Sequence, residues 1–239
     1  MITKEQIDYL AKFYRIDSFT IIREYLQLIF LSYLYQKKEG KKIFFKGGTA
    51  IRFLLGSPRF SEDLDFSTTL AKEKIKNLIQ EIGRVMNQEI PSIKIILLYS
   101  GKNTERYRIK YQGKETKYPL VIRLDFHRVK KIEEKEVSHL ITKFPIVFFP
   151  LVSHLSKEII LKEKLQALIS RGKPRDFFDV WFLMKKGISI KGKVNKTLIR
   201  KKIKNISQRR LEKELNKFLP IFQRPITKKL KEELLNLLI

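Results

Sequence analysis

The stretch FFKGGTAIRFLLGSPRFSEDLDFS, residues 44–67, decides the fold that we expect for this chain. Its pattern predicts a strand that ends at Gly47 and Gly48, then a short helix, a loop and a second strand. Asp63 and Asp65 lie one residue apart on that second strand. Because side chains alternate along a strand, we expect both carboxylates on the same face.

The paired aspartates predict a site for a divalent metal ion. Two like charges so close together are costly unless a cation lies between them. Asp125 lies in a third expected strand, residues 120–128, and would complete a carboxylate triad suited to nucleotidyl transfer with two metal ions if the strands are neighbours. Upstream, the free amides of Gly47 and Gly48 and the hydroxyl of Thr49 lie at a helix N-terminus, where they could accept a phosphate.

Each feature also has a simpler explanation. A glycine pair before a helix is often a tight turn, two aspartates can mark a solvated strand end, and Asp125 could pair with Arg123 or Arg128. The order in which the features occur is more specific. A strand, two glycines, a helix, an Asp-x-Asp strand and a later strand with an aspartate are typical of the nucleotidyltransferase fold of polymerase β.

The rest of the chain predicts an α+β protein with a mixed sheet flanked by helices and a helical C-terminal part. Helices are expected within residues 3–15 and 17–38, and over 71–88, 156–170, 174–186, 195–205, 208–218 and 226–238. Further strands are expected near 93–99, 107–111 and 141–148. We therefore expect a nucleotidyltransferase core with N-terminal helices over 1–150, and a helical domain over 151–239 that completes the active-site cleft.

Composition limits the possible partners and compartments. The 239 residues contain 51 Lys and Arg against 25 Asp and Glu, and the net charge of +26 indicates a nucleic acid, a nucleotide or an acidic partner. The absence of cysteine excludes disulfides, thiolate metal sites and cysteine nucleophiles. The N-terminus is amphipathic, and the most apolar early run, residues 26–35, is shorter than the ~20 residues that span a bilayer. We expect a cytoplasmic protein with no membrane partner.

Two further patterns have alternative explanations. Tyr107, Arg108, Lys110 and Tyr111 interleave aromatic and basic side chains, which suits either a surface for single-stranded RNA or an ordinary exposed sheet face. The aromatic stripe around Trp181 has helical spacing, and we expect it to form core rather than a base-stacking platform.

The segment GGTAIRFLLGSPRFSEDLDF, residues 47–66, resembles the opening motif of the AbiEii/AbiGii toxin family, which comprises nucleotidyltransferase-like toxins of type IV toxin–antitoxin systems. Arg59 and Ser61 belong to that motif. A second block, EIILKEKLQALISRGKPRDFFDVWFL at 158–183, is similar to the downstream Lys and Asp motifs of the family.

The resemblance implies that Lys164 contacts the nucleotide phosphates and that Asp176 and Asp179 line the same cleft. From the residues alone, these two acids could simply favour the N-terminus of a helix. Arg171 could bind nucleotide or RNA, or could pair with a nearby acid.

The expected function is transfer of a nucleotide from an NTP to RNA, with Mg²⁺ or Mn²⁺ as cofactor. The resemblance implies that the acceptor is the 3′ end of tRNA, that translation is inhibited, and that an antitoxin is encoded nearby. The expected catalytic residues are Asp63, Asp65, Asp125, Lys164 and Asp179, the first three as metal ligands. The expected nucleotide-binding residues are Gly47, Gly48, Thr49, Lys164, Arg171 and Asp176.

Two other functions are compatible with the same sequence. One is a catalytically silent RNA-binding or regulatory protein that retains the fold. The other is a nucleotidyltransferase that modifies a protein or a small molecule, such as an aminoglycoside.

Overall fold

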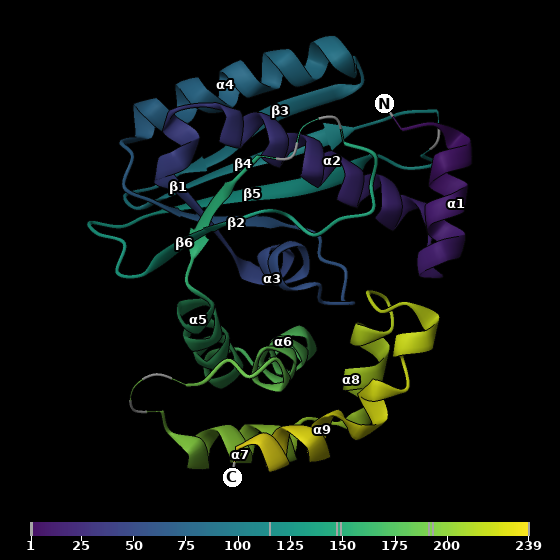
Figure 1. Ribbon diagram of the computed structural model, residues 1–239, viewed down its shortest axis with the longest axis vertical. Helices are drawn as coiled ribbons and strands as arrows, with labels where there is room; N and C mark the ends of the chain where they lie inside the picture. Colours follow the sequence, from purple (N-terminus) through teal and green to yellow (C-terminus); the bar gives the residue numbers. More distant parts are fainter. Residues whose placement is uncertain are drawn as a thin grey trace. The chain divides into compact units, whose positions relative to one another are not determined.

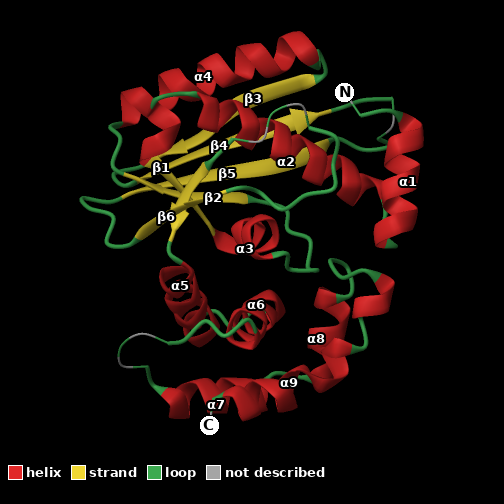
Figure 2. Cartoon of the chain, in the orientation of Figure 1, coloured by secondary structure: helices red, strands yellow, loops and turns green. Residues whose placement is uncertain are grey.

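The computed structural model describes residues 2–114, 116–146, 148, 150–190, 192 and 194–238. Within these residues, seven strands form one mixed sheet in the order β3-β4-β5-β2-β1-β7-β6 (Figures 1 and 2). The chain divides into two compact units. The sheet unit comprises Met1–Gly56 and Phe60–Leu155, and the helical unit comprises Ser57–Arg59 and Ser156–Ile239.

The strands of the sheet unit range from four to nine residues. They are β1 (Ile43–Lys46), β2 (Leu64–Thr68), β3 (Ile93–Ser100), β4 (Thr104–Tyr111), β5 (Leu120–Arg128), β6 (Lys135–Ser138) and β7 (Val152–Leu155). The strands β2 and β5 are parallel, as are β1 and β7, whereas the other neighbouring pairs are antiparallel. The sheet is therefore mixed, as the sequence predicted.

One face of the sheet forms the core of the sheet unit. Its helices are α1 (Lys4–Tyr14), α2 (Ser18–Gln36), α3 (Gly47–Leu55) and α4 (Lys72–Glu89). Phe66 of β2 stacks on Phe126 of β5 at 4.9 Å between ring centroids, and Phe30 of α2 lies 6.3 Å from Phe66. The helices α2 and α4 lie along the sheet in Figure 1, and α2 covers the face that carries these rings. That coverage leaves the alternate side chains of β2 and β5 on the opposite face.

The helical unit has its own core, built around α6. Its helices are α5 (Lys157–Ser170), α6 (Pro174–Lys185), α7 (Lys196–Asn205), α8 (Gln208–Leu215) and α9 (Ile226–Leu237). Phe177 and Phe178 are buried, and Trp181 packs beside Phe178 with 5.2 Å between ring centroids. The indole Nε1 of Trp181 donates a hydrogen bond to Glu233 Oε2 at 2.8 Å. The aromatic stripe of this helix is core, as expected.

One predicted strand is wrong. Residues 141–146 and 148 lie in no strand, and residue 147 of that prediction lies outside the described part of the chain. The side chains of Ile141 and Phe148 are 59% and 47% exposed, and Pro145 has no amide proton to donate to a ladder. The polypeptide instead forms β6 and β7 on either side of this segment, and neither strand was predicted.

None of the helices in the described part of the chain is both long and apolar enough to span a membrane.

Candidate active site

Two of the predicted carboxylates lie side by side on adjacent strands. The strands β2 and β5 run parallel, and their register places Asp65 directly beside Asp125. Neighbouring strands lie about 4.8 Å apart, so side chains at paired positions on one face are within reach of each other. Asp63 immediately precedes Leu64, the first residue of β2. The two strands are therefore neighbours, which is the condition that the predicted carboxylate triad required.

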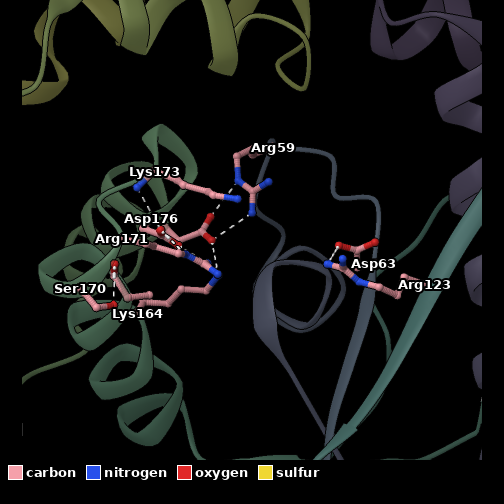
Figure 3. A network of polar contacts seen from close by, with 10 residues as sticks. Arg59, Asp63, Arg123, Lys164, Ser170, Arg171, Lys173 and Asp176 are labelled. Atoms are coloured by element: carbon pink, nitrogen blue, oxygen red, sulfur yellow. Dashed lines mark hydrogen bonds and ion pairs between the residues drawn. The ribbon is translucent and has the colours of Figure 1, made fainter. Parts of the chain in front are cut away.

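Two arginines hold these carboxylates together. Arg123 contacts Asp63 at 2.5 Å (Nη2 to Oδ2) and Asp125 at 3.0 Å (Nε to Oδ2); Figure 3 shows the contact with Asp63. Arg106 contacts Asp125 at 2.5 Å (Nε to Oδ1). The pKa of Arg106 is raised, mainly by its hydrogen bond with Asp125 and further by the charges of Asp125, Asp63 and Asp65. All three carboxylates thus act on one cation, which indicates that they converge.

The glycine turn makes room for one of these carboxylates. Helix α3 begins at Gly47, whose φ of 81° lies in the left-handed region. A Cβ atom at this position would lie 2.2 Å from Asp65 Oδ2, so a larger residue would displace the carboxylate. Thr49 is buried and its hydroxyl donates a hydrogen bond to the backbone oxygen of Asp63. Gly47 and Thr49 therefore position the aspartates, while phosphate binding by Gly47, Gly48 and Thr49 stays a prediction.

The carboxylate cluster has the chemistry of a site for a hard divalent cation. Mg²⁺ and Mn²⁺ prefer carboxylate oxygens, and Asp63, Asp65 and Asp125 supply only oxygen donors. The side chains of Asp63 and Asp125 are 24% and 19% exposed, so a cation can reach them from solvent. Among the described residues, no group of three acids or histidines is already arranged to hold an ion, because guanidinium groups lie between the carboxylates. The donor set fits a divalent metal.

In the helical unit, a buried carboxylate binds two cations. Asp179 of α6 has no exposed surface. Arg59 forms two hydrogen bonds with it, Nε to Oδ1 at 2.8 Å and Nη2 to Oδ2 at 3.0 Å. Lys164 of α5 contacts Asp179 Oδ2 through Nζ at 2.7 Å. Figure 3 labels Arg59 and Lys164, the two cations that bind this carboxylate.

The two cations keep Asp179 charged. Burial alone raises the pKa of this carboxyl, but the charges and hydrogen bonds of Arg59 and Lys164 outweigh burial, and the net effect lowers the pKa. The sequence placed Arg59 in a family motif but gave it no partner. A separation of 120 residues has no periodicity that could reveal the pair.

Arg171 and Asp176 form a pair that the sequence had left open. Arg171 donates from Nε to Asp176 Oδ2 at 2.8 Å and from Nη2 to Asp176 Oδ1 at 2.7 Å. Asp176 Oδ2 also accepts the backbone N–H of Lys173 at 3.2 Å, at the start of α6. These contacts are those of a helix cap joined to an ion pair. A role for either residue in nucleotide binding stays a prediction.

Buried tyrosines rule out one of the two interpretations of the strand β4. Tyr107 and Tyr111 of β4 are only 3% and 1% exposed. They pack in the core and cannot stack on the bases of RNA, so the stacking interpretation of this segment is wrong. The basic residues between them point to the opposite face.

Known proteins share the fold of this chain. The family model "Nucleotidyl transferase AbiEii toxin, Type IV TA system" matches residues 29–237. No curated protein matches the chain significantly.

Two solved structures are similar to this chain over nearly the whole length of both proteins. JHP933 from Helicobacter pylori has a TM-score of 0.60 and 21% identity, with 93% of this chain and 91% of that chain covered. MenT4, a nucleotidyltransferase toxin from Mycobacterium tuberculosis H37Rv, has a TM-score of 0.65 and 15% identity, with 100% and 90% covered. At these identities the likeness shows the fold, and the predicted α+β nucleotidyltransferase fold is confirmed.

Proposed function

The chain belongs to the AbiEii family of nucleotidyltransferase toxins, and from this premise we propose that it uses a divalent metal to transfer a nucleotide from an NTP to the 3′ end of a tRNA, thereby inhibiting translation. Membership of a type IV toxin–antitoxin family also implies an antitoxin partner. The net charge of +26 supports a polyanionic acceptor.

The observation that carries the proposal is the pairing of Asp65 with Asp125 on parallel strands, with Asp63 joined to Asp125 through Arg123. A divalent cation held by these carboxylates would neutralise charge on the triphosphate and on the leaving pyrophosphate. Three acidic side chains gather within an otherwise basic protein. A site that only bound anions would not need these acids, so their presence favours a reaction at a hydroxyl group.

The proposed step is an in-line displacement. The 3′-hydroxyl oxygen of the acceptor attacks the α-phosphorus of the NTP, and the bond from that phosphorus to the β-phosphate bridging oxygen breaks. Pyrophosphate leaves with the electron pair of that bond. The proton of the hydroxyl passes to the carboxylate of Asp125, which acts as general base.

We assign Lys164 to the phosphates of the nucleotide, as the family resemblance implies. Asp179 fixes the Lys164 ammonium at 2.7 Å, so the charge is oriented before the nucleotide arrives. Asp179 is then a positioning residue, and Arg59 holds it in place. Arg171 and Asp176 are kept as further candidates for nucleotide contact.

Label transfer tests the proposal. The protein is incubated with each α-³²P-labelled NTP, Mg²⁺ or Mn²⁺, and total tRNA, and the products are separated by electrophoresis. We expect label on tRNA, and none on tRNA whose 3′ end has been oxidised with periodate. Asp65→Asn and Lys164→Met should lower transfer by about 10²-fold or more. Asp8→Asn, an exposed acid on α1, is the matched control and should transfer label normally.

The other functions predict different results from the same experiment. If label appeared on a protein or on a small molecule and not on RNA, the acceptor would be that molecule and not tRNA. No transfer by the wild type to any acceptor, with RNA binding intact, would instead favour the silent RNA-binding protein.

A further inference from the structure

One face of the strands β3, β4 and β5 collects basic side chains. Because directly paired residues of antiparallel strands share a face, the register places Lys94 beside Lys110 and Arg108 beside Arg123. We call these four residues the basic ladder. The alternate residues of β4 point the other way, into the core.

The ladder leads to the carboxylate cluster. Arg108 and Arg123 form the row next to Arg106 and Asp125, and Lys94 and Lys110 form the row beyond. Asp125 in turn lies beside Asp65 on β2. Successive rows are two residues apart, about 7 Å along the strands.

The arrangement is unfavourable for the protein alone. Like charges directly opposite each other on neighbouring strands repel, and the ladder contains two such pairs in succession. The only carboxylate that these three fully described strands place on this face is Asp125, which is already bound by Arg106 and Arg123. The other acid of the strands, Glu105, is buried and accepts a hydrogen bond from Ser100.

Three members of the ladder lack a counter-charge. Lys94, Arg108 and Lys110 form no ion pair with any residue that the structure describes. Arg108 Nε is also buried without a hydrogen-bond partner. A guanidinium nitrogen left unpaired is costly, and a phosphate beside the Arg108 side chain would offset its charge.

We propose that the basic ladder binds the sugar–phosphate backbone of the single-stranded 3′ end of the acceptor RNA and directs its terminal hydroxyl toward Asp125. The ladder is three strands wide, about 10 Å, which suits one backbone rather than a duplex. Ile96, beside Arg108, is 37% exposed and offers an apolar contact to a base. This inference rests on the proposed function for its acceptor.

An acidic protein is the less favoured occupant. The ladder ends at the three carboxylates, which would repel an acidic polypeptide but would meet the neutral sugar hydroxyl of an RNA 3′ end. The phosphates of one strand would neutralise both repelling pairs in succession, as binding along a row of cations requires.

The test measures RNA binding apart from catalysis. A fluorescein-labelled single-stranded RNA with a free 3′ hydroxyl is titrated with protein in EDTA, without NTP, over a range of NaCl concentrations. For Lys94→Gln/Arg108→Gln/Lys110→Gln, we expect the slope of log K against log salt to lose about 2 in magnitude, because each phosphate contact to a single strand contributes about 0.7.

The matched control removes the same charge from the helix α4. Lys74→Gln/Lys76→Gln/Arg84→Gln changes three exposed basic residues of the same unit, and we expect the slope to remain near that of the wild type. If Arg108→Gln impairs folding, Lys94→Gln/Lys110→Gln alone should still lower the slope by about 1.4.

Equal slopes for the ladder variant and the α4 variant would overturn the proposal. Polyglutamate, titrated in the same way, stands for an acidic protein. If the ladder variant loses binding to polyglutamate while its RNA binding is unchanged, the proposal is overturned in favour of an acidic protein. Both outcomes are independent of label transfer: a ladder variant that loses RNA affinity supports the proposal even if wild-type protein transfers no nucleotide.

Discussion

At the scale of single residues, Gly47 connects backbone conformation to the position of Asp65, which we propose as a metal ligand. Gly47 and Gly56 both have positive φ, 81° and 72°. A Cβ at Gly47 would collide with Asp65 Oδ2 at 2.2 Å, whereas one at Gly56 would meet nothing within 4 Å. An alanine at Gly56 would therefore have only the backbone cost of a positive φ, whereas an alanine at Gly47 would also disturb the Asp65 carboxylate.

We predict that Gly47→Ala and Gly56→Ala destabilise the protein by a similar amount, about 1–2 kcal/mol, because both force alanine into the left-handed region. Only Gly47→Ala should also lower nucleotide transfer, by about 10²-fold, since it displaces the Asp65 carboxylate. Urea unfolding and label transfer measure the two effects. Equal activities in the two variants would show that the position of Asp65 does not matter.

Asp179 makes a second prediction at this scale. Removing one partner of a buried charge leaves it uncompensated, so Arg59→Met should lower the free energy of unfolding by about 3–5 kcal/mol at pH 7. Arg209→Met, an exposed arginine of the same unit, is the control and should change it little. A loss for Arg59→Met no larger than the control would mean that Lys164 alone compensates Asp179.

The pH dependence of the same pair has a definite sign. The pKa of Asp179 is lowered from its usual value of 3.8, so its contribution to stability is fully present above pH 3.8 and is lost as pH falls through the lower folded-state pKa. Without Arg59, burial acts against a single cation and the pKa rises. Acid unfolding of Arg59→Met should therefore begin at a higher pH than that of the wild type.

At the scale of elements, the sequence predicted what depends on local patterns. The alternation in residues 120–128 predicted a strand that coincides with β5. The predictions failed at the four-residue strands β6 and β7, which hold too little periodicity to stand out, whereas β1, equally short, was marked by the glycine pair that follows it. The alternation in residues 141–148 misled for another reason: Phe144 and Ile146 are buried at alternate positions, but Pro145 between them has no amide proton to donate to a ladder.

The same limit applies to the candidate site. The patterns around these aspartates are local, and they correctly predicted that Asp65 and Asp125 lie on strands. The prediction for Asp63 was wrong, because that residue precedes β2 by one position. Pairings between distant segments were not readable. Many basic residues could pair with Asp179 or with Asp125. Only the folded structure shows that the partners include Arg59 and Arg106.

At the scale of the whole molecule, the charge of +26 works against folding. Mutual repulsion of so many basic groups destabilises a compact chain, and salt weakens that repulsion because the screening length falls from about 30 Å at 0.01 M to about 3 Å at 1 M. The buried pairs of Asp179 and of Glu24 with Arg52 are screened far less, since solvent ions do not reach them.

We therefore predict that the midpoint of thermal unfolding rises by several degrees between 0.02 and 0.5 M NaCl, given that about 1 kcal/mol shifts the midpoint of a chain this size by about 2–4 °C. Lys74→Gln/Lys76→Gln/Arg84→Gln carries less charge and should show a smaller rise. Differential scanning calorimetry in NaCl and in KCl measures both. A midpoint that falls with salt would contradict this prediction. It would mean that attractive surface ion pairs outweigh the repulsion between basic groups, and that the excess positive charge costs the folded protein little stability.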